Sequence, residues 1–406
     1  MTFTPTQRIC ELVFRSWANK PATARTGNAL TVNSIRVDGR NLPLQVSSAG
    51  APRGAPGTLV EATLPACRGE GEEVAVEVSF DIRLGAGTDE RVGYSRREQI
   101  AWLGSAYPML AWTRADGWVR DDAVDVVGET ATSEVFRLRS LDVNAPSEYA
   151  VGAIGRPEGT PSAAPDGRTR HRFTADAVRD VTFTVGNIDV TSTSTDGLTI
   201  AVALPRGRVR ADAGAWDTAL RRALHGLSSL LGPIPTDHVS LSILPDVSEG
   251  VEFGQAIQFA DVDPDKDRWL ITHELAHLWF YGLVGNNQAR DPWLDEAFAT
   301  YAQEVVDRSG TTKNRGHIVK GAVGESMEQW SRRGRADAQY VDTVYGGGGR
   351  ALLQARDAAG ADAFDAAIQE YIRRAAWQIA TPADAAAALE HLPSATAALR
   401  AAGALR

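Results

Sequence analysis

Two histidines and a glutamate stand at the spacing of a metal site in the second half of the chain. His273, Glu274 and His277 form the pattern His-Glu-x-x-His inside an apolar run from Trp269 to Tyr281. On a helix, residues four apart lie on one face, so both imidazoles can reach the same metal ion. Glu274 lies beside them and can contact a water molecule on that metal. The pattern predicts a buried helix that carries a metal site.

A third ligand follows nineteen residues after His277. Glu296 lies in the segment Asp291-Pro-Trp-Leu-Asp-Glu-Ala-Phe-Ala-Thr-Tyr301. Two imidazoles, a carboxylate and an open position for water form a common catalytic zinc shell. A buried helix can also hold histidines that only bond to backbone, but the joint pattern favours one zinc ion bound by His273, His277 and Glu296.

The composition is that of a globular protein. The 406 residues are enough for two or three domains, and 43% of them are hydrophobic. The net charge of −9 without a basic block argues against nucleic acid as a partner. No apolar run is long enough to span a bilayer. The first residues, Met1 to Pro5, lack the basic and apolar regions of a signal peptide.

The first half of the chain shows the two-residue period of strands. Apolar and polar residues alternate from Val74 to Leu84, and shorter alternations occur at 30–37, 58–64, 181–185 and 198–204. Asp38-Gly39 is a hairpin signal. We expect a β-sandwich or saddle-shaped sheet over residues 1–206, with Gly155–Arg170 as a long exposed loop.

The second half changes to a helical period. Apolar spacing predicts a helix over 216–231 that ends at Gly232, then strands at 239–243 and 257–259. After the histidine helix, Asp291 as N-cap and Pro292 at the first position predict a helix with Glu296 in its second turn. Residues from 312 onward read as mostly helical. The expected class is multi-domain α+β, with residues 207–406 as the catalytic domain.

The two cysteines, Cys10 and Cys67, both lie beside strand-like runs of the N-terminal domain. A disulfide between them would imply an oxidising compartment, whereas two buried thiols are the alternative. Location is therefore open: extracytoplasmic with a disulfide and an upstream export segment, cytoplasmic otherwise.

The motifs around the proposed ligands resemble the gluzincin signature of the aminopeptidase N family. The usual family pattern is Trp-Leu-Asn-Glu-Gly-Phe-Ala, and this chain has Asp295 and Ala297 where Asn and Gly are common. The resemblance covers most of the chain. It implies a β-rich N-terminal domain, a thermolysin-like catalytic domain, and further N-terminal strands upstream of Met1.

The resemblance also implies residues for substrate binding. Family members carry Gly-x-Met-Glu-Asn, whose Glu binds the free α-amine of the substrate. Gly250-Val-Glu252-Phe253 occupies that place, with Phe253 in place of Asn. An ordinary acid at a strand edge is the alternative for Glu252. A weaker alignment places Gln99 where the family has a second amine-contacting residue.

A tyrosine completes the predicted site. Tyr345 precedes four glycines, Gly346 to Gly349, and matches the family tyrosine whose hydroxyl stabilises the oxyanion. The lysine often found two residues later is Gly347 here. A core tyrosine is the alternative. No Gly-Lys-Ser/Thr follows the glycines, which excludes a phosphate loop; we expect them to permit close backbone approach or movement of Tyr345.

These residues predict hydrolysis of peptide bonds. Zinc lowers the pKa of its bound water toward about 7. Glu274 takes the water proton as general base, Tyr345 stabilises the oxyanion, and Glu252 pairs with the N-terminal ammonium. The leading hypothesis is a zinc aminopeptidase acting on peptides.

Two alternatives stay open. The chain ends 110 residues after Glu296, so the large C-terminal helical domain of the family is absent or reduced in it. An open cleft would suit an endopeptidase or oligopeptidase. An inactive binding module on the same fold is the remote alternative, and the residue preference and oligomeric state are not determined by the sequence.

Overall fold

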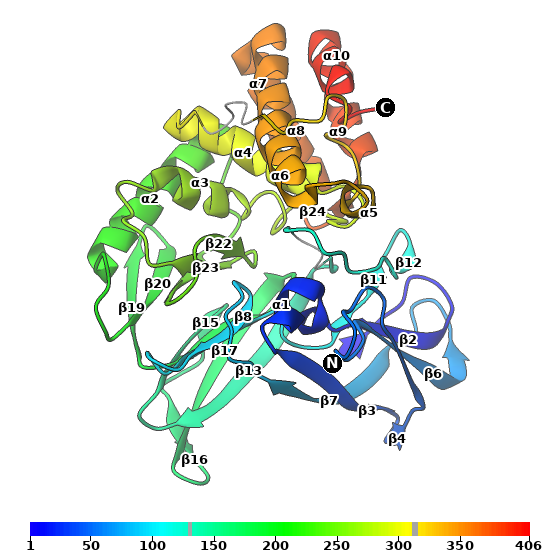
Figure 1. Ribbon diagram of the computed structural model, residues 1–406, viewed down its shortest axis with the longest axis vertical. Helices are drawn as coiled ribbons and strands as arrows, with labels where there is room; N and C mark the ends of the chain where they lie inside the picture. The colour runs from blue at the N-terminus through cyan, green and yellow to red at the C-terminus, as the bar shows by residue number, and fades with distance from the viewer. Residues whose placement is uncertain (129–131, 311–315) are drawn as a thin grey trace. The chain divides into compact units, whose positions relative to one another are not determined.

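The chain divides into two structural units. The computed structural model describes residues 1–128, 132–310 and 316–406 (Figure 1). One unit comprises Met1–Tyr94 and Trp102–Asp125, and the other comprises Ser95–Ala101 and Val126–Arg406. These two units are separated at other residues than 206, the end predicted for the N-terminal domain. The domain boundary after residue 206 remains a prediction.

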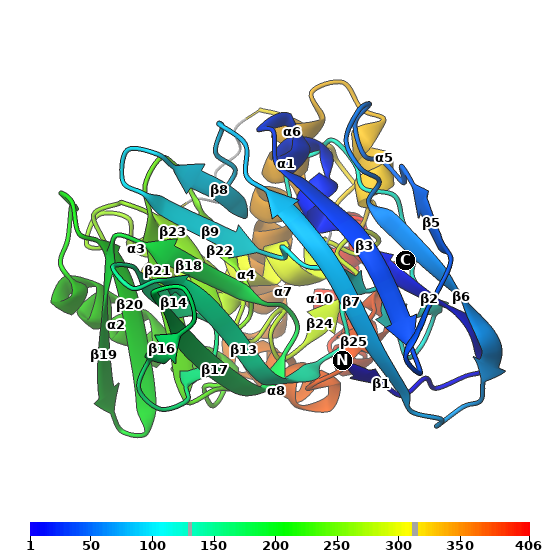
Figure 2. The ribbon, with the colours of Figure 1, turned by 90° about the horizontal axis from the view of Figure 1, so that it is seen from below.

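The first unit is built from two antiparallel four-stranded sheets, seen from below in Figure 2. One sheet has the order β1 (Thr2–Phe3), β7 (Val74–Arg83), β3 (Ala29–Val37), β4 (Arg40–Asn41). The other has the order β10 (Met109–Leu110), β2 (Ile9–Arg15), β6 (Leu59–Arg68), β5 (Leu44–Ser47). Alternate residues of both sheets, among them Phe14, Ile35 and Val76, form one apolar core. The predicted turn at Asp38-Gly39 joins β3 to β4, with φ of 51° and 74°.

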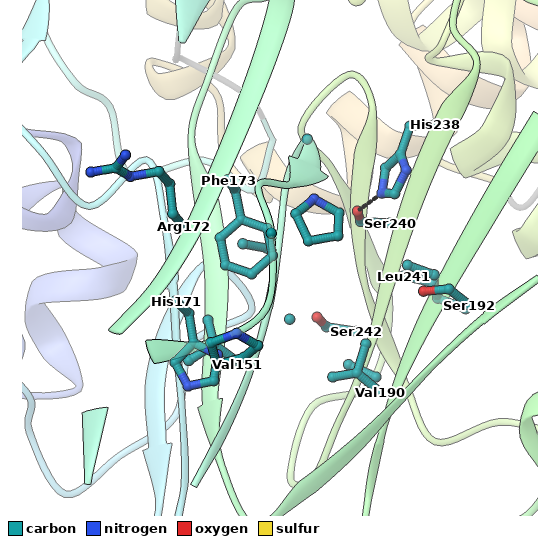
Figure 3. Close-up of a pocket in the computed structure, with 18 residues that line it drawn as sticks. Val151, His171, Arg172, Phe173, Val190, Ser192, His238, Ser240, Leu241 and Ser242 are labelled. Atoms are coloured by element: carbon teal, nitrogen blue, oxygen red, sulfur yellow. Dashed lines mark hydrogen bonds between the residues drawn. The ribbon is translucent and has the colours of Figure 1, made fainter. Parts of the chain in front are cut away.

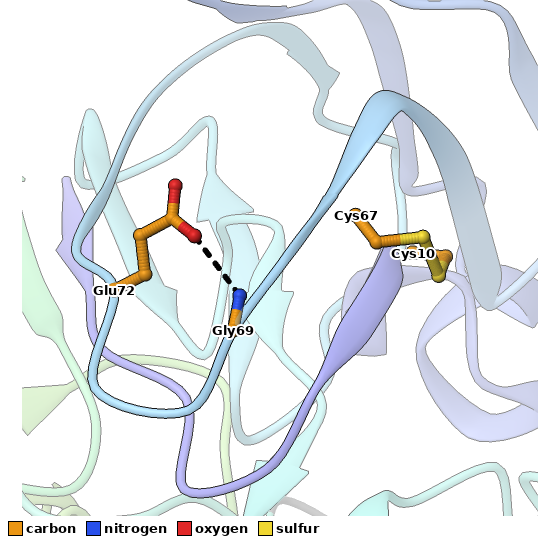
Figure 4. The surroundings of a disulfide bond; sticks show 4 residues. All are labelled: Cys10, Cys67, Gly69 and Glu72. Atoms are coloured by element: carbon orange, nitrogen blue, oxygen red, sulfur yellow. Dashed lines mark hydrogen bonds between the residues drawn. A yellow bond between two sulfur atoms is a disulfide. The ribbon is translucent and has the colours of Figure 1, made fainter.

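The cysteines form a disulfide inside this unit. Cys10 on β2 is bonded to Cys67 on the neighbouring antiparallel strand β6 (Figure 4). Beyond Cys67 the chain turns tightly, and the Gly69 N–H donates to Glu72 Oε2 at 3.0 Å. Of the two alternatives for the cysteines, a disulfide or two buried thiols, the structure therefore contains the disulfide.

The second unit contains a long antiparallel pair of strands. β13 (Phe136–Pro146) pairs with β17 (Arg168–Val178), which also pairs with β15 (Arg156–Pro157) and β16 (Ser162–Ala164). The prediction of one long exposed loop over Gly155–Arg170 is only partly correct: the segment is mostly exposed, but half of its residues lie in strands. Asp166 and Gly167 have φ of 58° and 66° and form a tight turn between β16 and β17. The Pro/Gly/Ala-rich composition concealed this hairpin signal.

A mixed five-stranded sheet lies in the second unit. Its order is β19 (Ile188–Thr195), β20 (Leu198–Pro205), β21 (His238–Leu244), β23 (Ala256–Ala260), β22 (Gly250–Glu252). The three central strands are parallel, and β22 is an antiparallel edge strand. Helix α2 (Ala213–Leu231) packs on the sheet, with Trp216 in edge contact with Phe259. As predicted, α2 ends at Gly232.

Helices make up most of the remaining chain (Figure 1). Those that build the site are α3 (Arg268–Ala276), α4 (Trp293–Asp307), the π-helix η2 (Val341–Gly347) and α7 (Gly348–Ala359). The others are α5 (Met327–Ser331), α6 (Ala336–Tyr340), α8 (Ala361–Ala375), α9 (Pro382–Ala388) and α10 (Pro393–Ala401). Within the described ranges, none of the helices has the length and apolar character needed to cross a bilayer.

Two helix boundaries differ from prediction. α3 ends at Ala276, with His277 as its C-cap, so the last part of the apolar run that ends at Tyr281 lies outside the helix. α4 starts at Trp293 with Pro292 as its N-cap, so Glu296 lies in the first turn and not the second. After α3 the backbone bonds span five residues, as from Gly282 N–H to His277 O at 2.9 Å, in place of the four-residue bonds of an α-helix. The shift at the start of α4 is a single residue, which is the usual spread between definitions of a helix end.

Candidate metal centre

Three side chains from α3 and α4 converge in the interior. His273 Nε2 lies 3.2 Å from Glu296 Oε2 and 3.4 Å from His277 Nε2, and His277 Nε2 lies 3.7 Å from Glu296 Oε2. Zinc bonds of about 2.0–2.1 Å in a tetrahedral shell place ligand atoms about 3.3 Å apart. The three donor atoms therefore fit one zinc ion without rearrangement of the backbone.

The packing of α4 brings Glu296 to the histidines. α4 is buried along most of its length, and its Ala297 faces Gly348 of α7. A Cβ at position 348 would lie 2.5 Å from Ala297 Cβ, so only glycine allows this approach. Of the four glycines after Tyr345, Gly348 thus has the predicted role of permitting close contact. At Gly346, a Cβ would meet no atom within 4 Å.

Glu274 lies against the edge strand of the sheet. A Cβ at Gly250 would lie 2.6 Å from Glu274 Cγ, so glycine at this position makes room for the carboxylate side chain. Ligand-type atoms of Glu252, Glu274 and His277 all lie within 4.8 Å of one another. Both carboxylates therefore face the metal ligands.

The ring nitrogen Nδ1 of His277 lies close to two hydrogen-bond acceptors. Its Nδ1 lies 2.6 Å from Asp295 Oδ1 and 3.1 Å from the carbonyl oxygen of Phe280. Two acceptors at Nδ1 keep the proton there and leave Nε2 for the metal. Although burial opposes the charged ring, Asp295 raises the pKa of His277 well above its usual range.

Glu252 is buried on β22 and faces the centre, with 4% of its surface exposed. Its Oε1 accepts a bond of 3.4 Å from the amide of Gln288. Phe253, the departure from the family pattern, is fully buried in an apolar cluster with Ile154 and Val251. Phe253 therefore contributes to the hydrophobic core, and Glu252 keeps its position on β22.

Tyr345 stands on the π-helix η2 beside the ligands. Its ring stacks on His273 and has an edge contact with Tyr340. Burial, followed by the charge of Glu296, raises the pKa of Tyr345 well above its usual range. The phenol therefore keeps its proton and can donate it in a hydrogen bond.

Gln99 is not brought to this centre. It is exposed, has a φ of 54°, and accepts a bond from Asn187 Nδ2 at 3.0 Å in the turn before β19. The structure gives no support to the predicted role in substrate binding.

Two residues at the centre were not predicted from the sequence. Asp295 was known only as a departure from a family pattern, although histidine ligands commonly donate their second N–H to a carboxylate. Gln288 lies in the segment between α3 and α4 and has no sequence signal of its own.

A hollow elsewhere in this unit has a different character. It is lined by Val151, Phe173 and Leu241 and by the polar residues His171, His238 and Ser240 (Figure 3). Burial lowers the pKa of both histidines, so both rings are neutral. His238 Nε2 lies 3.2 Å from Ser240 Oγ, which satisfies it within the hollow.

Comparison with known proteins agrees with the geometry of the metal centre. Residues 261–400 match the sequence profile of the peptidase family M1 domain. An aminopeptidase N from Streptomyces lividans is 31% identical over 137 residues, a match that covers 30% of this chain. The matched part spans only 16% of the length of that relative.

Solved structures resemble the whole chain. An M1 zinc metallopeptidase from Deinococcus radiodurans has a TM-score of 0.68 at 17% identity, over 99% of this chain and 87% of that one. A variant of an M1 zinc metallopeptidase from the same organism, bound to a Tyr-Ser-Ala substrate, has a TM-score of 0.67 over 99% and 88% of the chains. At this identity the likeness establishes the fold, and the predicted α+β class is confirmed.

Proposed function

We propose that this chain, whose residues 261–400 match the peptidase family M1 domain, is a zinc metallopeptidase that removes N-terminal residues from peptides. The observation that carries the proposal is the convergence of His273, His277 and Glu296, whose donor atoms lie 3.2–3.7 Å apart. One zinc ion bound there supplies a Lewis acid and lowers the pKa of a water molecule toward about 7.

Glu274 is the general base. It is 5% exposed and shares the space in front of the ligands with Glu252. A carboxylate at this position accepts the proton of the attacking water and then delivers it to the departing amine. The two proton transfers leave Glu274 unchanged at the end of the reaction.

Tyr345 supplies a hydrogen bond to the oxygen on which negative charge develops. Its stacking on His273 places the phenol ring beside a metal ligand, and its raised pKa keeps the proton on the oxygen. A donor already oriented before the reaction needs no reorganisation when the charge forms.

Glu252 gives the enzyme its preference for the N-terminal end of a substrate. Its carboxylate faces the centre from an edge strand and can pair with one ammonium group. The names of the relatives support this choice, because one is an aminopeptidase and another holds a tripeptide substrate. Peptides with a free α-amine are the proposed substrates.

The disulfide bears on location. Cys10 and Cys67 are bonded, and such bonds persist in oxidising environments. On the basis of this disulfide, we propose an extracytoplasmic location. Mass analysis of protein from its native source, under non-reducing conditions, tests it; free thiols there would place the enzyme in a reducing compartment.

Metal analysis and two matched peptides test the main proposal. We expect about one zinc ion per chain, loss of activity with a chelator, and recovery when zinc is restored. A peptide with a free N-terminus should be cut, and its N-acetylated form should not. Equal cleavage of both would replace the aminopeptidase with an endopeptidase, and absence of hydrolysis by the zinc-loaded chain would leave a binding module.

A further inference from the structure

A buried amide lies between the metal ligands and the carboxylate proposed to bind substrate. The side chain of Gln288 is 1% exposed. Its Nε2 donates to Asp295 Oδ2 at 2.7 Å and to Glu252 Oε1 at 3.4 Å. Its backbone N–H donates to Thr132 Oγ1 at 3.0 Å. Gln288 is therefore held at three points, of which two are carboxylates.

The two carboxylates determine which end of the amide faces them. An amide has two donor hydrogens on nitrogen and only acceptor sites on oxygen. If the amide were turned over, Oε1 would face oxygens of both Asp295 and Glu252, and three acceptors would meet without a proton. Because all three side chains are buried, this arrangement would be costly. Gln288 must therefore present its NH₂ group to Glu252.

Asp295 connects this amide to the metal site. One of its oxygens lies 2.6 Å from His277 Nδ1, and the other accepts the bond from Gln288. Asp295 is completely buried, so both contacts are formed away from solvent. The same carboxylate thus orients a zinc ligand on one side and the amide that reaches Glu252 on the other.

We propose that Gln288 is a positioning residue for substrate recognition, which holds Glu252 in the orientation that binds the N-terminal ammonium of a peptide. With Oε1 of Glu252 bonded to Gln288, the second oxygen stays available to the ammonium. The inference rests on the proposed function of Glu252, and it adds the residues that fix the geometry of this carboxylate.

The first test is the variant Gln288→Leu, with Gln303→Leu as its control. Gln303 is also 1% exposed and lies on α4, but its amide donates to Ser309 Oγ, away from the ligands. For a free-amine peptide, Gln288→Leu should raise KM about tenfold with little change in kcat, because a bond to a charged group is lost. Zinc content should stay at the wild-type level, and Gln303→Leu should leave KM unchanged.

The variant Asp295→Asn provides a second, independent test. Its Oδ1 can still accept from His277, so we expect zinc to stay bound. Its NH₂ group then faces Gln288, whose amide must turn over to accept and so withdraws its donor from Glu252. KM should rise as in Gln288→Leu, and the double variant should be no worse than either single one, because both act through one contact.

The outcomes separate this inference from the function on which it rests. A wild-type enzyme that cuts free and acetylated peptides equally would remove the role of Glu252, and the inference with it. A wild type that discriminates, together with a zinc-loaded Gln288→Leu that has an unchanged KM, would overturn the inference alone. Additive effects of Gln288→Leu and Asp295→Asn would also overturn it.

Discussion

The ring of Tyr345 is stacked on the ring of His273, with centroids 5.7 Å apart and planes inclined by only 14°. A residue of the π-helix η2 thereby packs against His273 of α3, a proposed metal ligand. Short π-helical turns are frequent at functional sites. The contact also means that the ring and the hydroxyl of Tyr345 have separable roles, one in packing and one in chemistry.

Tyr345→Phe removes the hydroxyl and keeps the stacked ring. We expect kcat to fall on the order of 100-fold with little change in KM, because the lost hydrogen bond forms only as charge develops. Zinc content should not change. Steady-state kinetics with a free-amine peptide measures the effect, and an unchanged kcat would make Tyr345 a packing residue only.

Glu274→Gln keeps the size of the side chain and removes the base. The variant should bind zinc as the wild type does and lose turnover, because an amide cannot accept the proton of water. Glu304→Gln is a suitable control, since Glu304 is also buried but accepts bonds from Ser309 and Gly310 at the end of α4. Normal kcat in the zinc-loaded Glu274→Gln variant would refute the assignment.

Gly348→Ala tests the packing of α7 on α4. The backbone at Gly348 is helical, so alanine would be tolerated by conformation, but its methyl group would collide with Ala297. Overpacking of this kind costs about 1–3 kcal/mol of unfolding free energy. The compensating change Ala297→Gly should restore much of it, whereas Gly346→Ala, which faces open space, should cost little. Denaturant titration of the four proteins decides the point, and equal stability of Gly348→Ala and wild type would show that the helices can separate freely.

His238 makes stability depend on pH. Burial lowers the pKa of His238 in the folded protein, while the unfolded chain has the usual value near about 6.5. Above that pH the ring is neutral in both states. As the pH falls below it, the unfolded chain takes up the proton first, so the unfolding free energy decreases. Between about pH 7.5 and 5.5, the wild type should lose more stability than His238→Gln, as measured by urea titration; equal losses would mean that the ring is protonated in the fold.

Local patterns in the sequence were sufficient for much of the site. The spacing of His273 and His277 places two imidazoles on one helical face, and this depends only on the geometry of a helix. Glu296 was predicted because two imidazoles and a carboxylate form a common zinc shell, and Tyr345 was predicted through a family motif; the structure places both beside the histidines. Regular alternation likewise predicted β7 and the helical period predicted α2, because each pattern needs a single buried face.

Contacts between distant segments could not be obtained in that way. The exact start of α4, the hairpin concealed within 155–170, and the failure of Gln99 to reach the centre all depend on what packs against each segment. The bridge from Asp295 through Gln288 to Glu252 joins a helix, a connecting segment and an edge strand. No spacing along the chain encodes such a bridge. Polar groups that are buried together lose their water and must form hydrogen bonds with one another. Only the folded structure decides which groups are buried together.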